Sequence, residues 1–164
     1  MQLKNFYSTS PLLGPYDKNK WDIRFIKLAY EVASWSKDPN KKVGCVLVHP
    51  NKRLISLGYN GFPKYISDDS QRLADKVLKN KLTLHAEANA ILNASTSDLN
   101  SWSAYCTLAP CTHCSLLLIQ KGINRVVHPK IGQYSCSWTE NQQLATNLLR
   151  EASIQVITYE VSEC

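Results

Sequence analysis

The sequence has no long apolar run and few cysteines, and both absences restrict the class of protein. Nowhere do eighteen apolar residues follow one another, so no segment is expected to span a membrane. The first twenty residues lack the continuous apolar stretch of a secretory signal peptide. Six cysteines in 164 residues are too sparse for a disulfide-rich secreted domain. We therefore expect a soluble, cytoplasmic protein, in which clustered cysteines more often bind metal or react as thiols than form disulfides.

The chain is long enough for one domain with a full hydrophobic core. Lys and Arg number 19 against 13 Asp and Glu, and the net charge of +6 suits nucleic acid, an anionic membrane surface or a phosphorylated metabolite. The basic residues are scattered without an Arg-rich tail, so we expect neither a membrane nor a nucleic-acid partner. Residues 1–19 are rich in Pro and small polar residues and are expected to be an extension, whereas residues 20–164 should form a single domain.

Hydrophobic periodicity predicts an α/β domain. Helical spacing is expected over 21–35, with its Trp and Phe residues in the core, and over 73–79, 84–94, 112–121 and 139–152. Short apolar runs predict strands over 43–48, 53–59, 104–108, 123–128 and 154–161. The first two strands, joined by a Pro/Asn turn, should form a hairpin. The later strands alternate with helices, so the sheet should be antiparallel at one edge and parallel elsewhere.

Two short motifs carry the residues suited to metal chemistry. His85-Ala86-Glu87 opens one predicted helix, and Pro110-Cys111-Thr112-His113-Cys114 follows a predicted strand and opens the next helix. A Cys-x-x-Cys pair at a helix N-terminus places two sulfurs on one face, where the helix dipole stabilises thiolate. His85, Cys111 and Cys114 would give zinc three ligands and leave the fourth tetrahedral position open, which is the catalytic arrangement.

Glu87 suits a proton shuttle beside such a metal better than a fourth ligand, because it lies only two residues from His85. Two other interpretations remain open. The cysteines could be a redox pair, although this leaves the His-x-Glu motif unexplained. Alternatively, His113 or Cys106 could supply a fourth ligand and close a structural zinc site. We expect His113 to lie on the surface and Cys45 to lie in the core.

With these motifs, the sequence resembles the cytidine/deoxycytidylate deaminase superfamily, and within it the deoxycytidylate branch. The resemblance runs from Trp21 to about Tyr159. It rests on the two zinc motifs and on further short segments: Trp35-Ser-Lys-Asp-Pro39, Val43-Gly44, Gly58-Tyr-Asn-Gly-Phe-Pro63, His85-Ala-Glu-Ala-Asn-Ala-Ile91 and Ile119-Gln-Lys-Gly-Ile123. The zinc motifs are typical of the whole superfamily, whereas the segments at 35–39 and 58–61 favour the deoxycytidylate branch.

The resemblance implies a three-layer α/β/α sandwich around a five-stranded mixed sheet, with a catalytic Zn²⁺ between two helix N-termini. It implies hydrolysis of dCMP to dUMP and ammonia, which supplies dTMP synthesis, with Glu87 passing protons to N3 and to the departing amine. Family positions assign substrate contacts to Asn60 and to the backbone at Ala86, Ala109 and Pro110. We add Lys37 as a candidate phosphate contact, with a solvated lysine at a helix end as the alternative.

The resemblance also implies regulation and assembly. In the family, the segment Gly58-Tyr59-Asn60-Gly61 belongs to a site for dCTP as activator and dTTP as inhibitor within a homohexamer, and Mg²⁺ is expected with a bound triphosphate. Alternatively, Gly58 and Gly61 could serve turns that need positive φ. The chain departs from the family at Trp102, Ala109 and Ser115, which affects substrate choice rather than the reaction class.

Two other functions remain to be distinguished. The first is a deaminase that acts on dCTP, on another cytidine compound or on a tRNA base, which would be flipped into the pocket. The second is a non-catalytic structural zinc module that binds nucleic acid or a partner protein. A closed metal site and an absence of turnover would distinguish this module from an enzyme.

Overall fold

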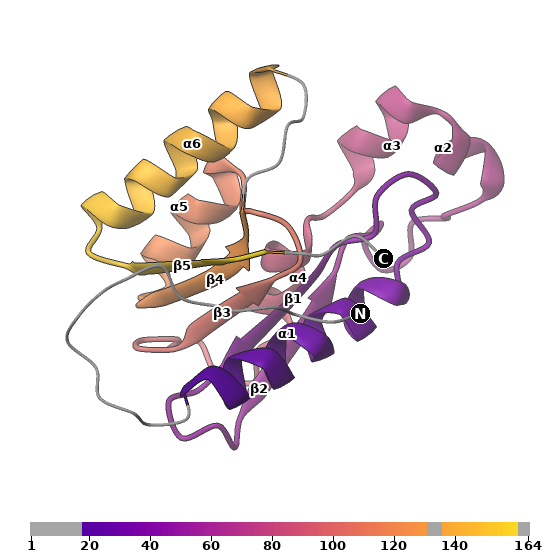
Figure 1. Ribbon diagram of the computed structural model, residues 1–164. Helices are drawn as coiled ribbons and strands as arrows, with labels where there is room; N and C mark the ends of the chain where they lie inside the picture. The colour runs from indigo at the N-terminus through magenta and orange to yellow at the C-terminus, as the bar shows by residue number, and fades with distance from the viewer. Residues whose placement is uncertain (1–17, 131–135, 161–164) are drawn as a thin grey trace.

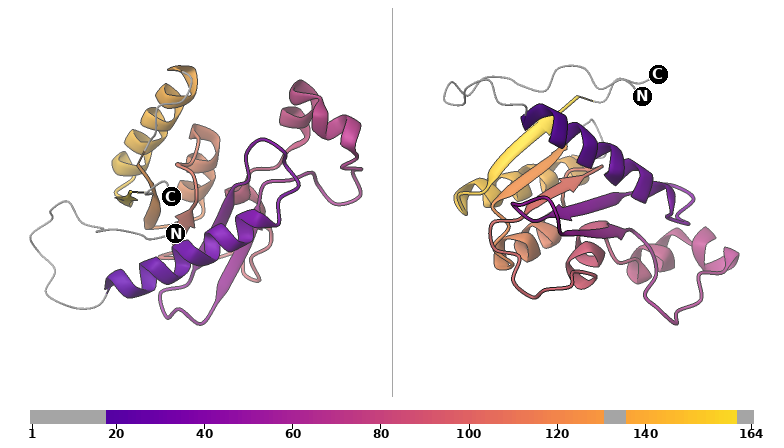
Figure 2. Two further views of the ribbon diagram at one scale, coloured as in Figure 1. Left: turned by 45° about the vertical axis from the view of Figure 1, so that its right-hand side comes forward. Right: turned by 90° about the horizontal axis from the view of Figure 1, so that it is seen from below.

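The computed structural model describes residues 18–130 and 136–160, which form three layers (Figures 1 and 2). One face of a five-stranded sheet is covered by α1, and the other face by α4, α5 and α6. The helices are α1 (Lys18–Ser34), α2 (Ser70–Ala74), α3 (Lys76–Leu82), α4 (Ala86–Leu92), α5 (Thr112–Gln120) and α6 (Cys136–Glu151). The strands are β1 (Gly44–Val48), β2 (Ile55–Tyr59), β3 (Ser103–Cys106), β4 (Arg125–Pro129) and β5 (Gln155–Tyr159). The predicted α/β/α sandwich is confirmed.

The strand order in the sheet is β2-β1-β3-β4-β5. The predicted hairpin is confirmed, since β1 pairs antiparallel with β2 in a register that places Gly44 opposite Tyr59. β1 is also antiparallel to β3, whereas β3, β4 and β5 are parallel to one another. The sheet is therefore mixed, as expected, and its antiparallel part extends one strand pair beyond the hairpin.

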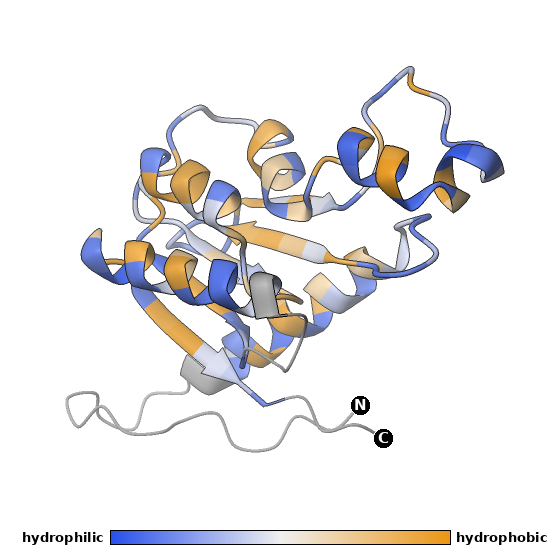
Figure 3. Ribbon diagram, turned by 90° about the horizontal axis from the view of Figure 1, so that it is seen from above, coloured by the Kyte–Doolittle hydropathy of each residue, from blue (hydrophilic) through white to orange (hydrophobic). Residues whose placement is uncertain are grey.

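Alternation along the central strands divides the core between the two faces. In β1, Cys45 and Leu47 join the cluster under α4 and α5, whereas Val46 and Val48 join the cluster under α1. All five residues of β1 are buried because helices cover both faces. Figure 3 shows the result, with apolar residues along the central strands and alternating apolar and polar residues along the helices.

Two glycines let helices approach the sheet closely on opposite faces. A Cβ atom on Gly44 would lie 2.1 Å from the Ala29 carbonyl oxygen of α1, and one on Gly58 would lie 2.2 Å from the Ala86 carbonyl oxygen of α4. The alternative that Gly58 and Gly61 serve positive φ is wrong, because Gly122 is the one described glycine with positive φ, at 75°. Gly58 is instead required by the close packing of α4 against β2.

Other expectations differ from the structure in detail. The single helix expected over 73–79 is two helices, because the Asp75 side chain accepts hydrogen bonds from Val77 N and Leu78 N and starts α3. The expectation that the tryptophans of the first helix are core is wrong. Trp21 is 37% exposed, with Arg24 and Lys52 over its ring, and Trp35 is 50% exposed and meets the Tyr59 ring edge-on.

Some expectations fall partly or wholly outside the described residues. These are the extension over 1–19, of which 1–17 are not described, and the end of the last strand at Val161. Within the described residues, no helix is both long enough and apolar enough to cross a membrane.

Candidate functional site

The two predicted motifs meet where α4 and α5 begin. His85 and Cys111 occupy the N-cap positions of these helices, in extended backbone conformations, and neither side chain caps its own helix. The sulfurs of Cys111 and Cys114 each lie 3.4 Å from His85 Nδ1, and the three ligand atoms lie within 4.8 Å of one another. Because neither side chain is used as a helix cap, His85 and Cys111 can both point toward the same group of ligand atoms.

The electrostatics of this cluster fit a divalent cation. Hydrogen bonds from the Cys114 thiol and from His85 outweigh burial and lower the pKa of Cys111 to about 4. The same contact with Cys111, together with burial, raises the pKa of Cys114, because two neighbouring thiolates repel each other. A zinc ion stabilises both thiolates at once and prefers sulfur and imidazole ligands. The three side chains thus form a donor set for zinc.

The cluster has three ligands and is not closed by either candidate for a fourth. Among the residues whose side chains the structure describes, 20–130 and 138–160, no further His, Cys, Asp or Glu joins the group. His113 is exposed, as expected. Cys106 lies instead beside Cys45 on the neighbouring strand, with 3.7 Å between the sulfurs, and both thiols are buried. The donor set therefore corresponds to the open, catalytic type of zinc site.

Glu87 lies in the first turn of α4 and is only 4% exposed. Burial raises the pKa of Glu87, while the charge of His85 and a hydrogen bond with the Cys114 thiol act in the opposite direction. It stays outside the group of ligand atoms although it contacts that group. A buried carboxyl with a raised pKa is suited to exchange protons with a group bound at the neighbouring cluster.

The Asn60 side chain connects the strand end to the loop that precedes β1. Its Oδ1 accepts from Val43 N at 2.8 Å, and its Nδ2 donates to the Lys41 carbonyl at 2.9 Å. The Ser36 hydroxyl donates to the Asn60 carbonyl at 2.7 Å. These bonds give Asn60, which is 7% exposed, a structural role, and its contact with substrate stays a prediction.

The other predicted binding residues lie around the same end of the molecule. Gly61 forms an isolated bridge with Leu84, the residue before His85, so the 58–61 segment leads directly to the cluster. Ala86, Ala109 and Pro110 are buried beside the ligands in the chain. Lys37 is exposed and pairs with Asp68 at 2.7 Å. Their substrate and effector roles stay predictions.

A buried ion pair near Asn60 was not foreseen from the sequence. Lys79 of α3 donates to both carboxylate oxygens of Asp38 at 2.7 Å, and both side chains are nearly fully buried. Asp38 also accepts from the backbone amides of Asn40 and Lys41. No sequence signal marks Lys79, because its neighbours in α3 are exposed. The pair fastens the 62–83 segment to the loop before β1.

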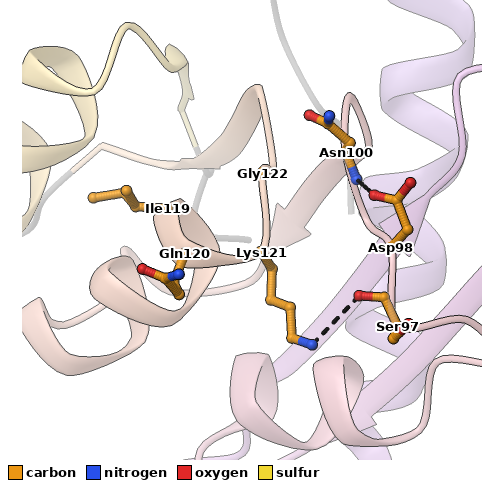
Figure 4. A pocket seen from close by; sticks show the side chains of 7 residues that line it. All are labelled: Ser97, Asp98, Asn100, Ile119, Gln120, Lys121 and Gly122. Carbon is orange, nitrogen blue, oxygen red and sulfur yellow. Dashed lines mark hydrogen bonds between the residues drawn. The ribbon is translucent and has the colours of Figure 1, made fainter.

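A surface hollow of about 530 Å³ lies away from the cluster (Figure 4). It is lined by the loop around Asp98 and by Lys121 and Gly122, at the C-terminal end of α5. The cluster lies at the N-terminal end of the same helix. The hollow is therefore separate from the metal centre.

Comparison with known proteins agrees with this geometry. Residues 19–129 match the cytidine and deoxycytidylate deaminase zinc-binding region. An uncharacterized deaminase in the luxG 3′ region of Aliivibrio fischeri is 37% identical over 84% of this chain and 92% of its own length. Human deoxycytidylate deaminase is 39% identical over 68% of this chain, which covers 65% of the human protein. The yeast Saccharomyces cerevisiae enzyme is 33% identical over 99% of this chain and 52% of its own length.

The fold matches that of solved deaminases. The dCMP deaminase of cyanophage S-TIM5, solved with dCMP and dUMP, superposes with a TM-score of 0.70 over 86% of this chain and 98% of the phage chain, at 23% identity. With its sequence relatives, its fold and its metal-ligand set in agreement, the chain belongs to the cytidine and deoxycytidylate deaminase family and carries the zinc-binding region of a hydrolytic deaminase.

Proposed function

We propose that the protein catalyses the zinc-dependent hydrolysis of dCMP to dUMP and ammonia, and so supplies dUMP for dTMP synthesis. The observation that carries the proposal is the three-ligand cluster with buried Glu87 beside it. The choice of dCMP is supported by curated relatives named deoxycytidylate deaminase and by the segments at 35–39 and 58–61. The net charge of +6 suits a phosphorylated substrate.

The chain's own groups account for the proton transfers. A zinc ion in such a site lowers the pKa of water toward neutrality. Glu87 accepts a proton from the attacking water and delivers it to N3, while the oxygen forms a bond to C4. Glu87 then carries the second proton of the water to the amino group, the bond from C4 to nitrogen breaks, and ammonia leaves. The buried position of Glu87 keeps both transfers local.

Substrate recognition is assigned to the residues that surround the cluster. The backbone at Ala86, Ala109 and Pro110 would contact the edge of the pyrimidine, because these residues adjoin the ligands and are buried. Asn60 would accept a hydrogen bond from a sugar hydroxyl through the second lone pair of its Oδ1, whereas a contact with the phosphate would require its Nδ2 to leave Lys41 or Asp38. Lys37 would reach the phosphate after exchanging its exposed pair with Asp68.

A substrate panel tests the choice of nucleotide. Ammonia release would be measured with dCMP, dCTP, CMP, deoxycytidine and a tRNA anticodon stem-loop. We expect the highest kcat/KM with dCMP. A preference for any other member of the panel would contradict the dCMP assignment, and zinc binding without turnover of any member would favour the non-catalytic module.

The role of Glu87 is tested by Glu87→Gln, which keeps the shape of the side chain and removes the proton carrier. We expect one bound zinc per chain and a loss of kcat of roughly 10²–10⁴-fold. The matched control is Glu31→Gln, because Glu31 is exposed on α1. Full activity in the Glu87 variant would contradict the proposed proton transfers.

Regulation and assembly are further parts of the proposal. The 58–61 segment supports a regulatory site that binds dCTP as activator and dTTP as inhibitor, each with Mg²⁺. We propose that the protein assembles as a homohexamer. We also infer a cytoplasmic location. Saturation curves for dCMP should become less sigmoidal with Mg²⁺ and dCTP, and more sigmoidal with dTTP. Sedimentation would give the assembly size. Hyperbolic curves that neither nucleotide changes would contradict the regulation.

A further inference from the structure

The segment that carries Cys111 is held by α6, a helix about thirty residues further along the chain. Gln142 Nε2 donates to the Ala109 carbonyl at 2.9 Å. The Thr112 amide donates to Asn141 Oδ1 at 2.9 Å, and the Thr112 hydroxyl donates to the Asn141 carbonyl at 3.2 Å. Two consecutive residues of α6 thus form hydrogen bonds to Ala109 and Thr112, the residues on either side of Pro110 and Cys111.

Asn141 supplies a cap that α5 cannot form by itself. The N-cap position normally holds a side chain whose oxygen accepts from the first backbone amides of the helix. In α5 this position is Cys111, whose sulfur lies 3.4 Å from His85 Nδ1 instead. The Asn141 oxygen accepts from the first amide of the helix, at Thr112. Asn141 therefore holds Thr112, the residue after Cys111, while the Cys111 sulfur stays directed at His85.

Gln142 holds the Ala109 carbonyl from inside the protein. Its side chain is fully buried, and its Oε1 has no hydrogen-bond partner among the described residues. Burying an unpartnered acceptor is unfavourable, and an apolar side chain of the same size would avoid that cost. What glutamine adds here is its bond to Ala109. A carbonyl oxygen has two lone pairs, so this bond leaves the second one for another donor, such as an amino group.

We propose that Asn141 and Gln142 are positioning residues with different tasks. Asn141 holds Cys111 in place for the metal. Gln142 orients the Ala109 carbonyl toward the amino group that leaves C4, an assignment that rests on the proposed function. Each residue contacts the backbone of 109–112, and neither belongs to the group of ligand atoms.

The task of Asn141 is tested by zinc affinity, measured by competition with a chelator. Asn141→Leu should bind zinc about 10–100-fold more weakly, because the outer support of a ligand is lost. Asn141→Asp keeps the accepting oxygen and should restore the affinity. The matched control is Asn147→Leu, at an exposed position of the same helix. Cobalt substitution adds a second readout, because the thiolate-to-cobalt absorption should change in Asn141→Leu alone.

The task of Gln142 is tested by turnover of the zinc-loaded enzyme. Gln142→Met has a similar volume and no donor, and should keep the zinc affinity while kcat for dCMP falls about tenfold and KM changes less than twofold. Gln143→Met, at an exposed position beside it, should leave both constants unchanged. Thermal unfolding of each variant with and without zinc separates this effect from a loss of folded protein.

Several outcomes would overturn the proposal. They are unchanged zinc affinity in folded Asn141→Leu, unchanged kcat in Gln142→Met, and an equal fall of kcat in Gln143→Met. If the unaltered protein prefers another nucleotide, the dCMP assignment fails and the Gln142 test is made with that substrate. If it turns over none, the Gln142 task fails with the function, whereas the zinc titration still decides the task of Asn141.

Discussion

The buried polar groups on the two faces of the sheet differ in how their charges are balanced. Under α1, the Asp22 carboxylate accepts from the Tyr105 hydroxyl at 2.7 Å and from the Arg125 guanidinium at 2.6 and 3.0 Å. That cluster pairs its opposite charges within the protein. Under α4 and α5, Cys111 and Cys114 bring together two sulfurs that would repel each other if both were ionised, and the raised pKa of Cys114 reflects that repulsion together with burial. The first arrangement balances its charges without a ligand, whereas the second forms a donor set that suits a bound cation.

The largest effect should come from removing one of the proposed metal ligands under α4 and α5. Cys114→Ser removes a thiolate ligand, so we expect loss of zinc binding and a fall in deaminase activity of more than about 10³-fold. Cys45→Ala is the matched control, because Cys45 is a buried cysteine on the same face outside the ligand group, and it should retain zinc. Metal analysis and activity assays check both variants. Stoichiometric zinc in Cys114→Ser would contradict the assignment of ligands.

The second largest effect should come from removing the ion pair between Asp22 and Arg125 under α1. Asp22→Asn leaves the Arg125 charge without its partner, and the free energy of unfolding should fall by about 3 kcal/mol. Zinc affinity should stay unchanged, because the network lies on the other face. Urea unfolding with and without zinc provides the measurement. Adding Arg125→Met should recover part of the loss, whereas strictly additive losses would show that the two charges do not interact.

The sequence could predict groups of residues that lie within short motifs, but not contacts between distant segments. The meeting of His85, Cys111 and Cys114 was predicted because two short motifs at helix starts carry these residues, and Glu87 belongs to the first of them. Asn141 and Gln142 were not, because their partners lie about thirty residues away and no spacing marks such a contact. Periodicity predicted most elements correctly, since it reports which face of an element is apolar.

Errors arose where packing between elements decides the outcome. Trp21 and Trp35 follow the helical period, but they lie at the margin of the α1 interface, where rings and cations from other segments cover them in part. Turn geometry was the alternative considered for Gly58, because nothing in the neighbouring sequence reveals that α4 packs against it. These contacts depend on the tertiary arrangement and are absent from any local pattern.

A third prediction compares the two glycines that hold helices against opposite faces. Gly44→Ala and Gly58→Ala each place a methyl group against helix backbone, so each should lower the free energy of unfolding by about 1–3 kcal/mol. The variants should differ in zinc affinity. Gly58 packs against α4, which begins beside His85, whereas Gly44 packs against α1. Zinc titration should therefore show weaker binding for Gly58→Ala alone, and equal weakening in both would contradict a separation of the two faces.

The smallest effect concerns the buried pair of Asp38 and Lys79. Burial raises the pKa of Asp38, but hydrogen bonds from Lys79 and from the amides of Asn40 and Lys41 outweigh it, so the pKa is lower than in the unfolded chain. This stabilisation is present above the unfolded pKa and is lost as the pH falls through the folded pKa.

The pH dependence of that pair can be isolated from the metal centre. In metal-free protein, the free energy of unfolding should fall more steeply from about pH 5 to 3 than in Lys79→Met, where Asp38 lacks its partner and its protonation relieves an unpaired buried charge. Lys37→Met, which breaks the exposed pair with Asp68, is the matched control and should keep the steeper slope. Parallel slopes for the unaltered protein and Lys79→Met would show that the pair is not a source of acid sensitivity. A steeper slope in the unaltered protein would show that Asp38 and Lys79 balance their charges within the protein, as Asp22 and Arg125 do, and that the pair needs no metal for this.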